Sequence, residues 1–463
     1  MFFDALFCCL SRGRKISSAR IFLPDSFLFA NFVQSVSLVF FMKIIATSDW
    51  HLGNLFHGND RLPEHKHFMN WLLAQIDEQK PDALLIAGDI FDNGNPSANA
   101  QSSFYDFLAD ATQQYPDMQI VITAGNHDSA NRLEAPRALL TRHKVEIRGN
   151  IRIDWENGDD GERRRIVNYD DLIIPIRNKE GEEIIVLAVP YLRSDIVQNQ
   201  NYSEGVNGFI RELTQRAREL YPDGILLMMA HMYATGADIA KNDASEKIVI
   251  GGQEEVNMDG WSNHPDYLTC GHIHKRQRIW NTDWARYSGS ILPMSFAEKD
   301  YTHGVDLVTF EGRKASVNQL VYTPQHRLRI LPEGDEELSP KKLEKLIETE
   351  LQDRTDGKLD EHFDYIVLKV KMDSVSNDEI SSLEELVNRK NAVLCKIQKV
   401  MPQSDLPTTA DNTQLQSIDD ILNRDPMDTL REAFYIINKT DMNEEQESML
   451  KELLASIKNE END

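Results

Sequence analysis

The chain of 463 residues is longer than a typical single domain, and 41% hydrophobic with 27% charged residues excludes both a disordered and a membrane-integral composition. Four scattered cysteines exclude a disulfide framework and favour a reducing compartment, so we expect a cytoplasmic protein without a membrane partner. The net charge of −25 argues against a uniformly basic surface for nucleic acid, but residues 331–463 account for −16 of it, with 32 acidic against 16 basic residues.

The first 41 residues combine a basic stretch with an apolar, aromatic run from Phe27 to Phe41. A signal peptide or membrane anchor is one interpretation of this pattern. However, Asp25 and several serine and asparagine residues interrupt the segment, and no small-residue cleavage site precedes the strand that Met42 opens. We therefore interpret residues 1–41 as an upstream extension that is not native, with Met42 as the natural first residue.

From Met42 onward, short apolar segments alternate with amphipathic ones, which is the pattern of a layered α/β domain. Strands are predicted at residues 43–47, 83–87, 120–123, 184–189, 225–229 and 267–269, with more between 286 and 320. Apolar stripes predict a helix after each of the first two strands. The hydrophilic stretch from Asp154 to Asp171 is predicted to form a surface hairpin or loop. We place the main domain at residues 42–330.

The pattern changes after Pro332. Ser339 and Pro340 are typical of a helix start, and alternating strand and helix signals up to Ile397 predict a small α/β domain at residues 331–400. Residues 401–424 are predicted to form an acidic linker, and residues 425–463 to form amphipathic helices. From the residues alone, these helices either fold back on their own domain or dock on a partner.

Five short polar motifs occur in order, and four of them directly follow a predicted strand. They are Asp49-Trp50-His51, Gly88-Asp89-Ile90-Phe91-Asp92, Gly125-Asn126-His127-Asp128, His231, and Gly271-His272-Ile273-His274. Because strand ends on one edge of an α/β sheet converge, these side chains can meet in space. Carboxylate, imidazole and amide oxygen together suit divalent ions such as manganese, iron or zinc.

Each motif alone is weak evidence. A single histidine after an apolar strand is more often a packed core residue, and the asparagine and glycines are common turn formers. All five motifs in order predict a centre for two divalent ions. Its candidate ligands are Asp49, His51, Asp89, Asn126, His231, His272 and His274.

The chain resembles the metallophosphoesterase superfamily, whose motifs are DxH, GDxxD, GNHD, H and GHxH. Residues 88–97, 125–136 and 286–296 resemble the SbcD branch in particular, the nuclease subunits of bacterial SbcCD complexes. The resemblance is close from Met42 to about Leu331 and extends further only in layout. It implies an α/β fold with a central β-sandwich flanked by helices, a small α/β capping domain at 331–400, and C-terminal helices.

The resemblance also implies roles for individual residues. One ion would be held by Asp49, His51, Asp89 and His274, and the other by Asp89, Asn126, His231 and His272, so that Asp89 bridges them. His127 would contact the scissile phosphate and help to protonate the leaving oxygen, with Asp128 orienting its ring. Asp92 would stand behind the ligands. The expected metal is Mn²⁺.

The implied function is a metal-dependent DNA nuclease, with 3′ to 5′ double-strand exonuclease and single-strand endonuclease activity, in DNA end processing, recombination and repair. The implied partners are DNA, a second copy of the chain, and an SbcC-type ATPase that binds the C-terminal helices within a heterotetramer. Lys275, Arg276 and Arg278 are the local candidates for phosphate contacts, or else an ordinary solvated turn.

Two other functions compete with a nuclease. Phosphoprotein phosphatases typically carry GDxHG, GDxVDRG and GNHE, and the Asp at position 128 and the Leu-Gly pair after His51 fit those patterns less well. A phosphatase acting on small phosphate esters or phosphoproteins therefore remains the first alternative. A catalytically silent scaffold is the second, although every expected ligand is present.

Overall fold

The computed structural model describes residues 41–157, 163–197, 201–238, 255–258, 261, 264–334, 337–371, 376–400 and 446–447. Residue 41 apart, the predicted upstream extension lies outside these residues. So do the predicted linker and, except for residues 446–447, the predicted C-terminal helices. None of the helices within the described part of the chain is both long and apolar enough to cross a bilayer.

The first of two large sheets is built around four parallel strands. Its order is β16 (Lys314–Val321), β15 (Gly304–Glu311), β1 (Phe41–Thr47), β4 (Ala83–Ala87), β5 (Gln119–Thr123) and β6 (Val145–Arg148). Strands β1, β4, β5 and β6 run parallel, whereas β15 is antiparallel to both β1 and β16. The carboxyl ends of β1, β4 and β5 therefore open at one edge of the sheet.

The second sheet repeats this arrangement. Its order is β13 (Gln277–Arg278), β14 (Ala285–Tyr287), β12 (Tyr267–Gly271), β11 (Ile225–His231), β10 (Glu183–Ala188) and β9 (Ile173–Arg177). Strands β10, β11, β12 and β14 run parallel, and β9 and β13 pair antiparallel at the two ends. The side chains of β11 are buried along its whole length, as expected for a central strand covered on both faces.

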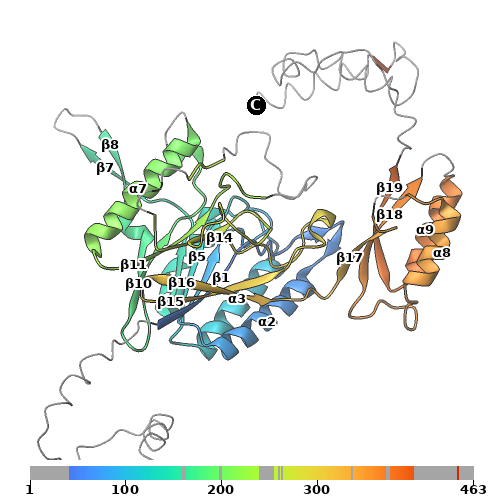
Figure 1. Ribbon diagram of the computed structural model, residues 1–463, viewed down its shortest axis with the longest axis horizontal. Coiled ribbons are helices and arrows are strands. Elements are labelled where there is room, and N and C mark those ends of the chain that lie inside the picture. The colour runs from blue at the N-terminus through green and yellow to red at the C-terminus, as the bar shows by residue number, and fades with distance from the viewer. Residues whose placement is uncertain are drawn as a thin grey trace, which may run out of the picture. The chain divides into compact units, whose positions relative to one another are not determined.

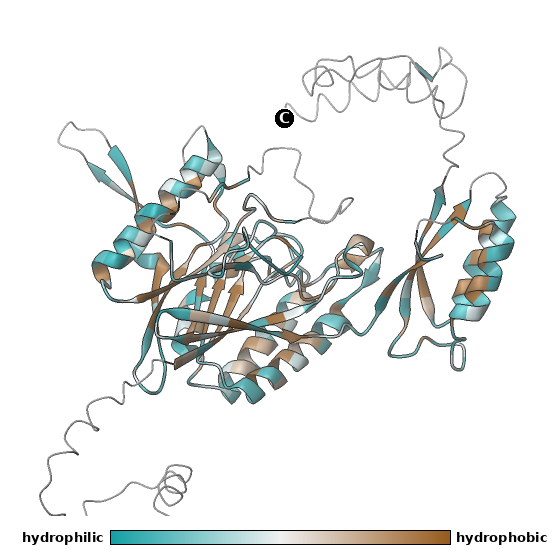
Figure 2. Cartoon of the chain, viewed as in Figure 1, coloured by the Kyte–Doolittle hydropathy of each residue, from teal (hydrophilic) through white to brown (hydrophobic). Residues whose placement is uncertain are grey.

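The two sheets pack face to face, and apolar side chains from both fill the space between them. Helices α2 (Leu62–Gln79) and α3 (Ala98–Gln114) cover the outer face of the first sheet, and α7 (Tyr202–Leu220) covers the outer face of the second (Figure 1). Figure 2 shows the inner strands of the sandwich as largely hydrophobic and the helices as two-faced. The predicted sandwich flanked by helices is confirmed.

Short elements connect these layers. They are β2 (Leu55–Phe56), β3 (Asn59–Asp60), α4 (Ala130–Glu134), α5 (Arg137–Leu140), η1 (Thr141–His143), η2 (Tyr169–Leu172), α6 (Ser194–Val197) and η3 (Phe296–Glu298). The predicted surface hairpin is present as β7 (Ile153–Asn157) paired with β8 (Arg163–Val167).

A third, three-stranded sheet carries its own core. Strands β17 (Arg327–Leu331), β18 (Asp364–Lys371) and β19 (Ala392–Val400) run parallel, and α8 (Pro340–Glu350) and α9 (Asn377–Arg389) pack on one face through buried side chains such as Leu343 and Leu383. Strand β17 begins before the boundary expected at residue 331. The sequence alone did not assign it to this sheet, because β17 is short and only its pairing with β18 reveals its place.

Candidate metal centre

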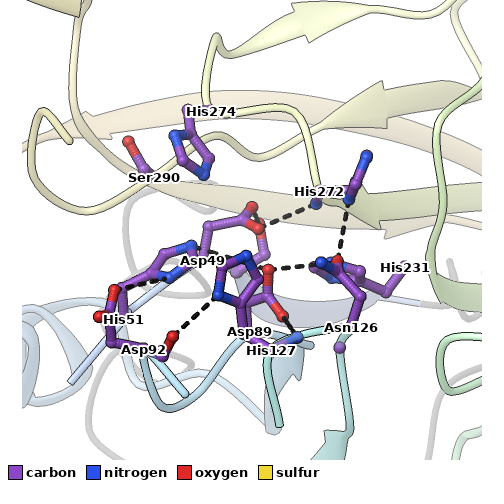
Figure 3. A network of polar contacts seen from close by, with 12 residues as sticks. Asp49, His51, Asp89, Asp92, Asn126, His127, His231, His272, His274 and Ser290 are labelled. Atoms are coloured by element: carbon purple, nitrogen blue, oxygen red, sulfur yellow. Dashed lines mark hydrogen bonds and ion pairs between the residues drawn. The ribbon is translucent and has the colours of Figure 1, made fainter. Parts of the chain in front are cut away.

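The five motifs lie together at the edge where the parallel strands of both large sheets end (Figure 3). Asp49, Asp89 and Asn126 stand in the loops after β1, β4 and β5 of the first sheet. His231 ends β11, and His272 follows β12, in the second sheet. The site is therefore assembled from both halves of the sandwich, as the motif order predicted.

The backbone at the motifs is unusual. Asp49, His51, Asp89 and His272 all have positive φ angles, of 53°, 47°, 49° and 95°. For residues with a side chain, such conformations cost about 1–3 kcal/mol each and cluster at functional sites. Hydrogen bonds from the Asp49 and His51 amides to the loop after β4 hold two of these positions.

Two glycines permit the close approach of the loops. A Cβ atom at Gly88 would lie 2.2 Å from Nδ1 of His231, and one at Gly125 would lie 2.1 Å from Oδ1 of Asp89. Neither contact is sterically possible. These glycines therefore do more than form turns, because they leave room for the candidate ligands themselves.

We call Asp49, His51 and His274 the first half of the site. One ligand atom from each lies within 4.8 Å of the others, and all three side chains are buried. Nε2 of His51 is buried without a hydrogen-bond partner and lies 3.7 Å from Oδ2 of Asp89. An unpartnered buried ring nitrogen among carboxylates is costly unless it binds something.

We call Asn126, His231 and His272 the second half of the site. The Oδ1 atom of Asn126 lies 3.0 Å from Nε2 of His231 and 3.0 Å from Nδ1 of His272. The other ring nitrogen of His231 lies 2.9 Å from the carbonyl oxygen of Ala87. These contacts bring three atoms of ligand type to one point.

Asp89 stands between the two halves. Its Oδ2 atom is 3.2 Å from Nε2 of His231 and 3.7 Å from Nε2 of His51. Burial would raise the pKa of Asp89, but the charge and hydrogen bond of His231 outweigh burial and hold the pKa well below its usual range. The carboxylate is therefore ionised and faces histidines from both sheets.

The same pairing acts on the histidines of the second half. Burial lowers the pKa of His231, but the charge of Asp89 outweighs it and raises the pKa to about 9. Burial, together with the charge of His231, lowers the pKa of His272 to about 3. In the metal-free site Asp89 is therefore ionised and His231 is protonated, whereas His272 is already neutral. A divalent ion bound by His231 would release its proton, because only the neutral imidazole ligates metal.

These residues fit a pair of divalent ions. Carboxylate, imidazole and amide oxygen donors surround Asp89 on two sides, and the unpartnered nitrogen of His51 suits a metal ligand. Neither cysteine of the described residues takes part, since Cys270 is buried in the core beside Met232 and Cys395 lies in β19. The donor set matches the hard to borderline ions that the sequence predicted.

Residues 42–276, about half of the chain, match the family described as calcineurin-like phosphoesterase. The chain belongs to this family. It is 34% identical over 304 residues to the SbcD subunit of the nuclease SbcCD from Rhodobacter capsulatus, covering 63% of this chain and 72% of that relative. It is 31% identical over 301 residues to the SbcD subunit from Escherichia coli strain K12, covering 60% and 68%. The resemblance to the SbcD branch is confirmed.

The histidine of the family's GNHD motif is His127. Its amide donates to Oδ1 of Asp89 at 2.9 Å, and its Nδ1 lies 2.8 Å from the main-chain carbonyl oxygen of Asp92. The side chain is half-buried, and one of its ring nitrogens lies within 4.8 Å of ligand atoms of His51 and Asp89. His127 therefore borders the site with its ring direction held by the main chain.

The role expected for Asp128 needs correction. Its carboxylate accepts hydrogen bonds from the amides of Ile90 at 3.1 Å, Phe91 at 2.9 Å and Gly125 at 2.9 Å. In this structure the group that orients the His127 ring is thus the Asp92 carbonyl, and Asp128 ties the loops after β4 and β5 together. Burial and the charge of Asp89 raise the pKa of Asp128 to about 6.

Supporting side chains stand behind the first half. Oδ1 of Asp92 lies 3.5 Å from Nδ1 of His51 and accepts from Asn54 at 2.9 Å, in line with its expected place behind the ligands. Oε1 of Glu298, in η3, lies 2.9 Å from Nδ1 of His274. Glu298 was not predicted from the sequence, because it follows no strand and belongs to none of the five motifs.

The three basic residues after the last motif are all engaged in ion pairs. Lys275 pairs with Asp238, Arg276 with the buried Asp306 at 2.6 Å, and Arg278 with Asp283 at 3.1 Å. The Arg276 side chain is only 16% exposed. Arg276 therefore stabilises the fold. Lys275 and Arg278 are more exposed and remain accessible to a phosphate group.

Proposed function

We propose that the chain is a metal-dependent DNA nuclease of the SbcD type. The observation that carries this proposal is the convergence of ligand side chains from two sheets around Asp89. The chain is 34% and 31% identical to relatives named as nuclease subunits, and it covers 72% and 68% of their length.

We assign the first half and Asp89 to one divalent ion, and the second half and Asp89 to another, with Mn²⁺ as the metal. The positions of Asp49, His51 and His274 on one side, and of Asn126, His231 and His272 on the other, support this division. When bound, two such ions would activate water as the nucleophile and neutralise charge on the phosphate.

The remaining chemistry falls to His127. Its Nδ1 hydrogen bond to the Asp92 carbonyl leaves Nε2 to carry the transferable proton. A protonated Nε2 can donate to the departing sugar oxygen, so that cleavage leaves a 5′-phosphate and a free 3′-hydroxyl. Asp128 supports this geometry through the backbone rather than by touching the ring.

The finer parts of the proposal follow the relatives. We propose 3′ to 5′ exonuclease activity on double strands, endonuclease activity on single strands, and a cytoplasmic role in DNA repair and recombination. We also propose a homodimer that joins an SbcC-type ATPase through the predicted C-terminal helices. Residues 331–400 would act as the capping domain that guides DNA.

An end-labelled DNA duplex incubated with the purified chain and Mn²⁺ tests the proposal. We expect cleavage by the wild type and cleavage about 10³-fold slower by His127→Ala. The matched control is His143→Ala, since His143 is an exposed histidine of η1. Turnover of a simple phosphate ester without DNA cleavage, also in the presence of the ATPase subunit, would instead establish the phosphatase function. A manganese-loaded, folded chain inactive on both substrates would establish a silent scaffold.

A further inference from the structure

A buried ion pair beside the metal centre has no part in the chemistry described so far. Arg61 and Glu64, at the start of α2, are 0% and 1% exposed. Nε and Nη2 of Arg61 donate to the two carboxylate oxygens of Glu64, both at 2.8 Å. A buried ion pair adds little to stability compared with apolar residues of the same size, so its geometry is the more informative property.

On one side, this pair contacts the small α/β domain. The hydroxyl of Tyr365, in β18, donates to Oε1 of Glu64 at 3.3 Å, and Tyr365 is buried. The ring of Phe56 lies between the two regions, with its centroid 5.1 Å from the Arg61 guanidinium and 5.1 Å from the Tyr365 ring. A movement of β18 would therefore disturb Glu64 directly.

On the other side, the pair reaches a candidate metal ligand. Nη1 of Arg61 donates to the carbonyl oxygen of Pro293 at 2.5 Å. The amide of the next residue, Met294, donates to Oε2 of Glu298 at 2.9 Å. The other oxygen of Glu298 lies 2.9 Å from Nδ1 of His274. Each of these contacts joins buried or part-buried groups.

Apolar packing runs beside the polar contacts. The ring of Phe56 lies 5.4 Å from that of Phe296, which is in the same short helix, η3, as Glu298. Phe56 thus touches both the small domain and the element that carries the partner of His274. Because protein interiors are close-packed, a displacement at Tyr365 cannot be absorbed locally at this junction.

We propose that Tyr365, Glu64, Arg61 and Glu298 form a positioning relay that couples the placement of the small α/β domain to the metal affinity of the first half of the site. The inference rests on the proposed function, in that His274 must be a metal ligand. Glu298 fixes the His274 ring, and Arg61 fixes the Pro293 segment beside it. When Tyr365 moves away, the buried Glu64 carboxylate loses a hydrogen-bond donor. Arg61 and the Pro293 segment are then held less firmly.

The first test is Tyr365→Phe in the full chain, which keeps the ring and removes only the hydroxyl. We expect Mn²⁺ affinity at one of the two sites to fall about fivefold, the lower end of usual coupling effects. Isothermal titration calorimetry measures this affinity without any nuclease substrate. The matched control is Tyr169→Phe, whose hydroxyl donates to Glu212 at 2.7 Å away from the relay and should leave Mn²⁺ binding unchanged.

The second test uses reciprocity, because two coupled events must affect each other equally. Mn²⁺ should slow amide hydrogen exchange in β18 of the wild type, and the slowing should shrink in Tyr365→Phe. A purely structural role for Tyr365 would change exchange in the metal-free protein but not its response to Mn²⁺. Glu64→Gln serves as a second variant, in which we expect a larger loss of Mn²⁺ affinity and of the Mn²⁺ response than in Tyr365→Phe.

The outcomes separate the relay from the function on which it rests. If the wild type binds no Mn²⁺, the proposed metal centre fails and the relay with it. If the wild type binds Mn²⁺ and both Tyr365→Phe and Glu64→Gln bind it equally well, the relay is overturned and the metal centre stands. Reduced affinity together with a lost Mn²⁺ response in β18 supports the relay.

Discussion

The two halves of the metal centre are supported in different ways. Behind the first half stand ionisable side chains, with Glu298 on His274 and Asp92 beside His51. In the second half, the contact behind His231 comes from the main chain, with the Ala87 carbonyl holding its ring at the end of the fully buried strand β11. A charged side chain can be removed or moved by a substitution, whereas a main-chain carbonyl group of a strand cannot.

This difference indicates that the geometry of one half can be changed more easily than that of the other. In the second half, the ring of His231 is held by a main-chain carbonyl of the first sheet, which no side-chain substitution removes. In the first half, the buried carboxylate of Glu298 lies 2.9 Å from Nδ1 of His274 and sets the direction of that ring. We expect the first half to be the adjustable one.

The largest effect is expected where the halves meet. Asp89→Asn removes the charge that faces histidines from both sheets, so at least one ion should be lost. We expect nuclease activity to fall by about 10⁴-fold, because metal charge stabilisation contributes several kcal/mol. Elemental analysis counts the ions. The control is Asp77→Asn, at an exposed carboxylate paired with Lys80. Full occupancy of both sites in Asp89→Asn would show that this residue is no bridge.

His127→Ala should slow catalysis and leave metal binding unchanged in both halves of the site. We expect both ions to remain and cleavage to fall by about 10³-fold, within the usual range for loss of a general acid. Metal content and nuclease rate are measured on the same preparation. Loss of an ion would instead mean that His127 is a metal ligand. This is the strongest alternative, because one of its ring nitrogens lies within 4.8 Å of ligand atoms of His51 and Asp89.

Glu298→Gln tests the support of the first half alone. The change keeps the size of the side chain and removes its charge, so Mn²⁺ affinity should fall by about 10 to 100-fold at one site and stay unchanged at the other. Calorimetric titration resolves the two sites. Glu78→Gln, at an exposed position of α2, is the matched control. An equal loss at both sites would contradict the division into halves.

A separate prediction concerns the stability of the metal-free protein. His65 is buried near Arg61, and burial together with the Arg61 charge lowers its pKa from an ordinary 6.5 to about 3. Below pH 6.5 the unfolded chain therefore binds a proton that the folded chain refuses until about pH 3. Stability should decline across this window, with a slope from this residue approaching about 1.4 kcal/mol per pH unit.

Urea unfolding of the wild type and His65→Gln at about pH 7, 5.5 and 4 measures this decline. The variant should lose stability less steeply with falling pH, because its side chain does not titrate. His143→Gln, at an exposed histidine, should follow the wild type. Parallel curves for all three proteins would show that His65 is not held neutral by the fold.

Much of the fold was predictable because buried segments can be recognised from the pattern of apolar residues in the sequence. The runs at Ala83–Ala87 and Ile225–His231 are apolar almost throughout and form central strands covered on both faces. The position of four of the five motifs directly after a strand then followed, and so did the convergence of Asp89 and His231. Strand β17 was not predicted, because Arg327 and Arg329 interrupt its apolar residues and the sequence does not show where it pairs.

What the sequence by itself determined was the set of candidate ligands and the edge of the sheets at which they meet. Only the tertiary structure decided how they are supported: Glu298 behind His274, Asp128 on three amides, and the Asp92 carbonyl on His127. The physical reason is that ligand types and strand ends are local properties of the chain. Hydrogen bonds to main-chain atoms, and between residues distant in sequence, exist only once the loops have been brought together.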